Sequence, residues 1–120
     1  MRDPTRGGLA SVLNELATSA DVGIELDEGA VPVSGAVRSA CELLGFEPFH
    51  LANEGKVVLV VDETDRERCL AALRENTLGA DAAVVGTVLG DHRGVVFLKT
   101  AVGGHRVLDM LTGEQLPRIC

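Results

Sequence analysis

With 120 residues, the chain is long enough for one domain with a hydrophobic core but short for a complete nucleotide-dependent enzyme. Its hydrophobic residues (46%) and charged residues (24%) are in the proportions of a soluble globular protein, while a net charge of −7 and the absence of Trp and Tyr argue against nucleic acid as a partner. No apolar run approaches the roughly 20 residues that span a bilayer, and no secretory signal opens the chain, so we expect a cytoplasmic protein with no membrane contact.

The first half of the chain predicts helices and strands in alternation. Apolar residues at helical spacing indicate a helix over Thr5–Ala20, and alternating residues indicate a short strand over Val22–Leu26. A second amphipathic helix is predicted over Ser34–Leu44. After a loop at residues 46–56, the β-branched run Val57–Val61 predicts a central strand that is covered on both faces.

The second half predicts one helix and then a set of strands. Thr64–Glu67 has the pattern of a capping box and predicts a helix that ends near Asn76. Glycine-rich turns at Gly90–Gly94 and Gly103-Gly104 predict hairpins between the strands that follow. These strands are expected at residues 82–89, 95–100 and 105–108.

The order of these elements predicts an α/β (α+β) protein in which helices pack on a mixed sheet. The apolar pattern stops after residue 108. We therefore expect one domain over residues 1–108 and a flexible C-terminal tail over residues 109–120, which ends in Cys120.

Cys120 is the first candidate functional residue, because an exposed thiol at the end of a cytosolic chain oxidises and exchanges unless it has a role. It follows Pro117, which cannot continue a helix, and an arm of this length could carry a group between two sites. A chance terminal cysteine is the alternative. Cys41 and Cys69 fall on apolar helical faces and are expected to pack as small hydrophobes. Since the cysteines are widely spaced and form no CxxC pair, neither a metal site nor a disulfide framework is predicted.

Two other segments carry candidate residues. In the loop Asn53–Lys56, Glu54 could act as a general base if it is partly desolvated, although a solvated turn accounts for the same pattern. In Arg2–Gly8, the two glycines and Arg6 at the start of a helix suit an anion such as phosphate, and close packing against a neighbouring element is the alternative. Among the histidines, only His50 lies next to the loop Asn53–Lys56.

Together these segments resemble a known family. Met1–Ala10 (MRDPTRGGLA) and Leu13–Glu15 (LNE) are similar to the start of the C-terminal domain in aminoimidazole-ribonucleotide synthetase and its PurM-related superfamily. Ala52–Lys56 (ANEGK) resembles the second signature of that superfamily. Leu116–Cys120 (LPRIC) closely resembles the C-terminus of the HypE family of hydrogenase maturation proteins. The resemblance covers the whole chain but only the C-terminal half of those proteins.

The resemblance implies a three-layer α/β/α fold of the PurM C-terminal-domain type, partly like ferredoxin. It also implies an ATP-dependent carbamoyl dehydratase. In that reaction a HypF-like carbamoyltransferase carbamoylates the thiol of Cys120, and Glu54 helps to remove an amide proton. The resulting thiocyanate supplies the cyanide ligand of [NiFe] hydrogenase iron through a HypC–HypD complex. The residues implied to border the nucleotide cleft are Asp3, Arg6, Gly7, Gly8 and Asn53.

The N-terminal half of the family has no counterpart in this sequence. In the family, that half forms the homodimer and supplies most contacts to ATP and Mg2+, so the isolated chain is expected neither to bind ATP tightly nor to dehydrate a substrate. A non-catalytic interaction module, whose tail is only a docking peptide, is the rival interpretation. A selenophosphate- or thiamine-phosphate-forming relative is disfavoured, because those proteins place their reactive residues in the N-terminal half and have no use for a terminal cysteine.

Overall fold

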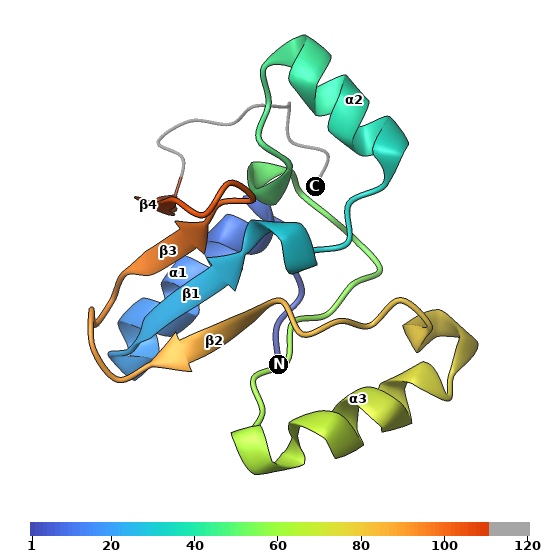
Figure 1. Cartoon of the computed structure of the whole chain (residues 1–120), viewed down its shortest axis with the longest axis vertical. Coiled ribbons are helices and arrows are strands. Elements are labelled where there is room, and N and C mark those ends of the chain that lie inside the picture. The colour runs from blue at the N-terminus through green and yellow to red at the C-terminus, as the bar shows by residue number, and fades with distance from the viewer. Residues whose placement is uncertain (111–120) are drawn as a thin grey trace.

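The structure is a computed structural model and describes residues 1–110 of the chain. Its strands are β1 (Gly23–Asp27), β2 (Gly86–Leu89), β3 (Val96–Lys99) and β4 (His105–Val107). They form one mixed sheet of four strands in the order β2-β1-β3-β4 (Figure 1). Strand β1 pairs with β2 antiparallel and with β3 parallel, and β3 pairs with β4 antiparallel.

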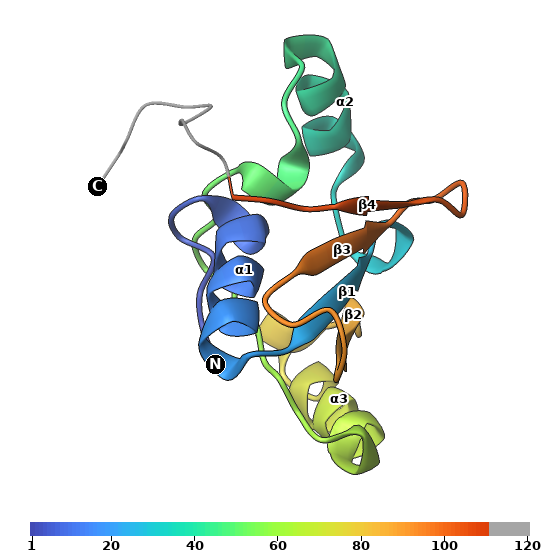
Figure 2. The ribbon, with the colours of Figure 1, turned by 90° about the vertical axis from the view of Figure 1, so that its left-hand side faces the viewer.

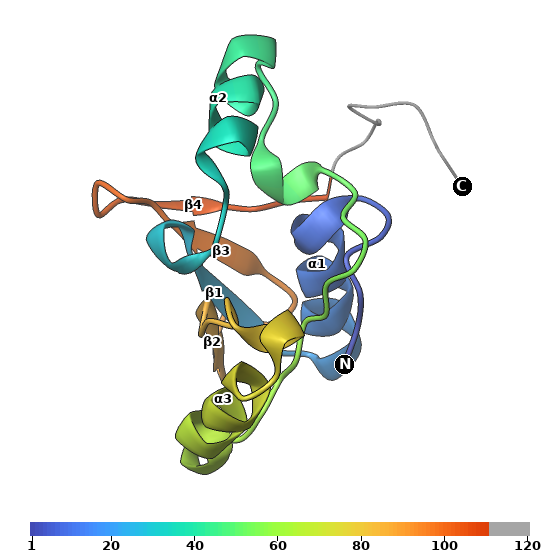
Figure 3. The same cartoon turned by 90° about the vertical axis from the view of Figure 1, so that its right-hand side faces the viewer.

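The described α-helices are α1 (Gly8–Ala20), α2 (Gly35–Leu44) and α3 (Arg66–Arg74). Helix α1 lies along one face of the sheet, against β1 and β3, whereas α2 and α3 stand at opposite ends of the molecule (Figures 2 and 3). The predicted class, with helices on a mixed sheet, is confirmed. Within residues 1–110, none of the helices is both long and apolar enough to cross a membrane.

The hydrophobic core lies between α1 and the sheet. Side chains on β1 and β3 alternate between the two faces of the sheet, so every second residue points toward α1. Helix α1 presents its apolar stripe to them. The buried residues of this cluster are Ala10, Leu13, Ala17, Ile24, Leu26, Phe49, Val96, Leu98 and Leu108. Leu108 lies just beyond β4, and the burial of its side chain in this core holds the backbone there in place.

The hairpin predicted at Gly90–Gly94 is wrong. Strands β2 and β3 are not neighbours, because β1 lies between them and pairs with both. The link crosses the start of β1, where the N–H of Gly94 donates to the carbonyl of Val22 at 2.8 Å. A glycine-rich turn indicates a change of chain direction, but not which strands pair. The second predicted hairpin, at Gly103-Gly104, joins β3 and β4 and is confirmed.

The central strand predicted at Val57–Val61 is also wrong. Among the described residues the run makes only an isolated bridge between Val58 and Arg2. Val57 and Val60 are 51% and 56% exposed. β-branched residues favour a strand where a neighbouring strand and a covering layer supply packing, and residues 1–110 offer this run neither.

The capping box predicted at Thr64–Glu67 is wrong in its cap residue, although the helix that follows is confirmed. Asp62 accepts hydrogen bonds from the backbone N–H of Thr64 at 2.9 Å and from its hydroxyl at 2.7 Å. These bonds open the 3-10 turn Glu63–Asp65, which leads into α3. The carboxylate of Asp62, two residues before the expected box, therefore fixes the start of this element.

Candidate functional site

Two segments that are far apart in the sequence lie side by side at the start of α1. The N–H of Arg2 donates to the carbonyl of Val58 at 3.0 Å, and the N–H of Val58 donates back at 2.6 Å. Farther along, the N–H of Asn53 donates to the carbonyl of Pro4 at 2.8 Å. The structure thus brings together the first and second family motifs. We call this junction, residues 2–8 and 49–58, the seam.

Gly7 and Gly8 form the start of α1 at the seam. Both have a φ of 66°, in the left-handed region that favours glycine. A Cβ atom on Gly8 would lie 2.4 Å from the carbonyl oxygen of Leu51 and 2.6 Å from that of Phe49. Close packing, the alternative considered for these glycines, therefore accounts for Gly8, and it brings the α1 N-terminus directly against the loop.

The polar residues predicted at this site lie along the seam and are exposed. Asp3 accepts a hydrogen bond from the hydroxyl of Thr5 at 2.8 Å. The side chain of Asn53 accepts one from Nζ of Lys56 at 3.1 Å. Glu54 stands between these last two residues, followed by a glycine with φ of 75°. Arg6, also exposed, completes the group on the N-terminal side.

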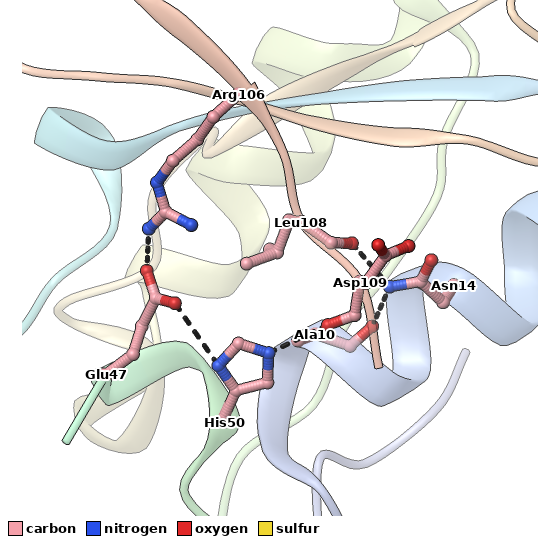
Figure 4. A network of polar contacts seen from close by, with 7 residues as sticks. All are labelled: Ala10, Asn14, Glu47, His50, Arg106, Leu108 and Asp109. Carbon is pink, nitrogen blue, oxygen red and sulfur yellow. Dashed lines mark hydrogen bonds and ion pairs between the residues drawn. The ribbon is translucent and has the colours of Figure 1, made fainter. Parts of the chain in front are cut away.

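A second polar group lies at the seam, and only its His50 was singled out from the sequence (Figure 4). Asn14 on α1 donates through Nδ2 to the carbonyls of Ala10 and Leu108, at 2.8 Å each. It is the buried polar residue of the described chain. The sequence carries a signal for it, because Asn inside an apolar helical stripe is unfavourable unless its side chain finds partners.

His50 belongs to the same group and ends the 3-10 turn Pro48–His50. Its Nε2 lies 2.8 Å from the carbonyl oxygen of Asp109, and its Nδ1 lies 3.3 Å from Oε2 of Glu47. Glu47 in turn pairs with Arg106 on β4. The side chain of His50 is 8% exposed, so its ring is largely shielded from water.

The predicted carrier thiol, Cys120, lies outside the described residues, as does the predicted tail from residue 111 onward. Cys41 is buried, as predicted. Cys69 is only half-buried, because no residue of α3 is fully buried. Within residues 1–110, no three His, Cys, Asp or Glu side chains are grouped so as to hold a metal ion.

Comparison with known proteins defines the class to which this fold and seam belong. Residues 1–99 match the family of the AIR synthase related protein, C-terminal domain, and the chain belongs to this family. It is 52% identical over all of its 120 residues to the carbamoyl dehydratase HypE of Cupriavidus necator. The predicted resemblance to HypE is confirmed. The chain spans about a third of the length of the curated relatives it matches (34% of that protein).

Solved structures agree. A crystal structure of the hydrogenase maturation protein HypE in complex with ATP is 50% identical, with a TM-score of 0.90 over 99% of this chain and 37% of that one. A crystal structure of a HypE–HypF complex is 42% identical, with a TM-score of 0.86 over 92% of this chain and 35% of that one. These matches confirm the predicted PurM C-terminal-domain-like fold.

Proposed function

We propose that the chain is the thiol-bearing C-terminal domain of an ATP-dependent carbamoyl dehydratase that makes the cyanide ligand of [NiFe] hydrogenase iron. The observation that carries this proposal is the similarity over the whole chain to proteins named carbamoyl dehydratase HypE. The seam supports it, because the two family motifs are hydrogen-bonded to each other there. The terminal Cys120 supplies the thiol that such a reaction needs.

In the proposed reaction, a HypF-like carbamoyltransferase first places a carbamoyl group on the thiol of Cys120. The amide oxygen of this S-carboxamide attacks the γ-phosphorus of ATP, the bond to ADP breaks, and one N–H proton passes to water. Glu54 then accepts the remaining N–H proton while the C–O bond breaks, so inorganic phosphate leaves and a thiocyanate remains. Phosphorylation is needed because oxide or hydroxide alone is a poor leaving group.

The seam residues have chemistry suited to these steps. Glu54 has a carboxylate on a short loop whose base is held by the hydrogen bond from Asn53 to Pro4. On the other side of the seam, the N-terminus of α1 and Arg6 favour anions. We therefore assign the border of the nucleotide cleft to Asp3, Arg6, Gly7, Gly8 and Asn53. The related crystal structure of HypE in complex with ATP supports a nucleotide as the ligand of this cleft.

The described residues do not form an acidic cluster suited to Mg2+. The proposal accordingly assigns the Mg2+ ligands, most ATP contacts and the homodimer interface to the part of a full-length protein that this chain does not include. The chain alone is then expected neither to bind ATP tightly nor to dehydrate a substrate. Steady-state ATP hydrolysis by the isolated chain would contradict this part of the proposal.

The proposed partners follow from the reaction. A HypF-like carbamoyltransferase must reach the thiol, and the related HypE–HypF crystal structure supports that partner. A HypC–HypD complex is proposed to take the cyano group onto iron. Both exchanges need the thiol to leave the site in which it is dehydrated, and they are proposed to take place in the cytoplasm.

The proposal is tested by intact mass measurement of the full-length protein that carries this chain, after incubation with HypF, carbamoyl phosphate and ATP. We expect a carbamoyl or cyano adduct on the wild type and on Cys69→Ser. This variant is the matched control, because it removes another cysteine thiol, one that is half-buried. Cys120→Ala should gain no adduct. Equal adducts on Cys120→Ala, or none on the wild type, would overturn the carrier role and favour the rival interaction module.

A further inference from the structure

The backbone is held firmly just after β4. The N–H of Leu108 donates to the carbonyl of Val96 at 2.8 Å, and the carbonyl of Leu108 accepts from Asn14 at the same distance. The next carbonyl, that of Asp109, lies 2.8 Å from Nε2 of His50. Because a carbonyl only accepts, Nε2 carries the proton in this bond. Three backbone groups of Leu108 and Asp109 are therefore bonded to β3, to α1 and to His50 of the seam.

Glu47 and Arg106 lie on the other side of the His50 ring. Its Nδ1 faces Oε2 of Glu47 at 3.3 Å, and Arg106 on β4 holds Glu47 in an ion pair. Among the described residues, Nδ1 is the buried side-chain nitrogen that lacks a hydrogen-bond partner. We call Asn14, Glu47, His50 and Arg106 the clasp (Figure 4).

The clasp connects the end of the described chain to the seam. Phe49, the neighbour of His50, is buried in the core, and its carbonyl packs on Gly8. Asn53 and Glu54 follow His50 by only three and four residues. Figures 2 and 3 show the coloured ribbon beyond β4 running to the N-terminal end of α1. The turn Pro48–His50 therefore leads into the proposed base loop and also holds the carbonyl of Asp109, near the point at which the tail begins.

We propose that His50 is a positioning residue for the carrier tail. By holding the carbonyl of Asp109, it fixes beside the seam the point from which the remaining residues lead to Cys120. The inference rests on the proposed function of Cys120. A tethered group reacts faster when its tether starts at a fixed point close to the reaction site, because fewer unproductive arrangements compete. The ten residues after Met110 span at most about 35 Å, so the position of their root matters.

Three variants test the proposal. His50→Ala removes the contact with Asp109. His50→Gln restores an N–H donor, because Nε2 of a glutamine side chain is separated from Cα by the same number of bonds as Nε2 of histidine. His105→Ala is the matched control, since His105 also lies on the β4 side of the molecule but is half-exposed and faces Glu25 instead of the clasp.

The first measurement is independent of catalysis. In the 120-residue chain, the amide N–H of Met110 shares its peptide plane with the carbonyl of Asp109, so its 15N order parameter reports on the clasp. We expect a value near about 0.85 for wild type, His50→Gln and His105→Ala, and below about 0.6 for His50→Ala. An unchanged order parameter in His50→Ala would show that His50 does not hold the root of the tail, and would overturn the proposal.

The second measurement uses the full-length dehydratase that carries this chain, already carbamoylated on its thiol. We expect single-turnover thiocyanate formation to be about tenfold slower in His50→Ala and within about twofold of wild type in His50→Gln and His105→Ala. If Met110 loosens but the rate is unchanged, the positioning role is wrong. If wild type itself forms no thiocyanate, the proposed function fails and the positioning role fails with it, whereas the order parameter still establishes whether the clasp exists.

Discussion

At the scale of single residues, Gly8 couples the start of α1 to the seam loop. It has a φ of +66°, and a Cβ there would lie 2.4 Å from the carbonyl oxygen of Leu51. In Gly8→Ala, either the helix and the loop separate or the backbone is strained. We expect the free energy of unfolding to fall by about 2–4 kcal/mol, as measured by urea denaturation.

Gly45 provides the control for this substitution. It caps α2 with a φ of +73°, but nothing lies within 4 Å of its would-be Cβ. Gly45→Ala should therefore show only the cost of a left-handed residue, about 1–2 kcal/mol. Equal losses in the two variants would mean that the close approach at Gly8 does not contribute.

Single residues also show why part of the site could be predicted and part could not. Asp3, Arg6 and Glu54 lie in contiguous motifs, so each is recognisable from its immediate neighbours. The clasp is assembled from contacts such as His50 with Asp109 and Asn14 with Leu108, whose partners are 59 and 94 positions apart. The pairing of β4 with β3, and the packing of α1 against β3 and the turn Pro48–His50, bring those positions together. No local sequence pattern predicts contacts between such distant positions.

At the scale of elements, the turn before α3 depends on the ionised carboxylate of Asp62. Hydrogen bonds from the hydroxyl and then from the backbone N–H of Thr64 lower the pKa of Asp62 below its ordinary value of 3.8. A lowered pKa in the folded state means that this contribution to stability is fully present above about pH 4 and is lost as the pH falls through the folded pKa. Asp62 is fully exposed, so a small effect is expected.

The hydroxyl is the larger cause of the shift, so Thr64→Ala should raise the pKa of Asp62 back toward 3.8. An NMR titration of the Asp62 carboxyl carbon measures it. Thr77→Ala is the control, because Thr77 lies in the next 3-10 turn and has no bond to Asp62 among the described contacts. The same pKa in Thr64→Ala and in the wild type would contradict the assignment of the shift to this hydroxyl.

Elements differ in how far the sequence alone predicts them. The α-helices were predictable because their period and their own hydrogen bonds are local. Helix α2 differs from its predicted range by one residue, since Ser34 is its cap, and it ends before Gly45. Strands depend on partners. The run Val57–Val61 has the composition of a central strand, yet the described chain gives it only one bridging residue, Arg2. The pairing of β1 with both β2 and β3 was likewise set by topology and not by turn composition.

At the scale of the whole molecule, burial is uneven. The core lies between α1 and the sheet, whereas the segment from residue 57 to residue 84 contacts mainly itself around α3. This segment carries several exposed large apolar side chains: Val57, Val60, Val61, Leu78 and Val84. Such a surface is costly for a monomeric chain in water. The chain also spans only about a third of the length of its curated relatives.

These two facts lead to a prediction about the run Val57–Val61, which within residues 1–110 makes only the bridge between Val58 and Arg2. An extended β-branched segment with unpaired backbone groups is a template for a further strand. In the 120-residue chain, we expect the amides of Val57, Val60 and Val61 to exchange with solvent at least about a hundredfold faster than those of Ile24 and Leu98 in the sheet. In a full-length protein that carries this chain, the same three amides should become protected. Slow exchange in the chain alone would mean that the run is already paired, and fast exchange in both would mean that nothing outside the chain covers it.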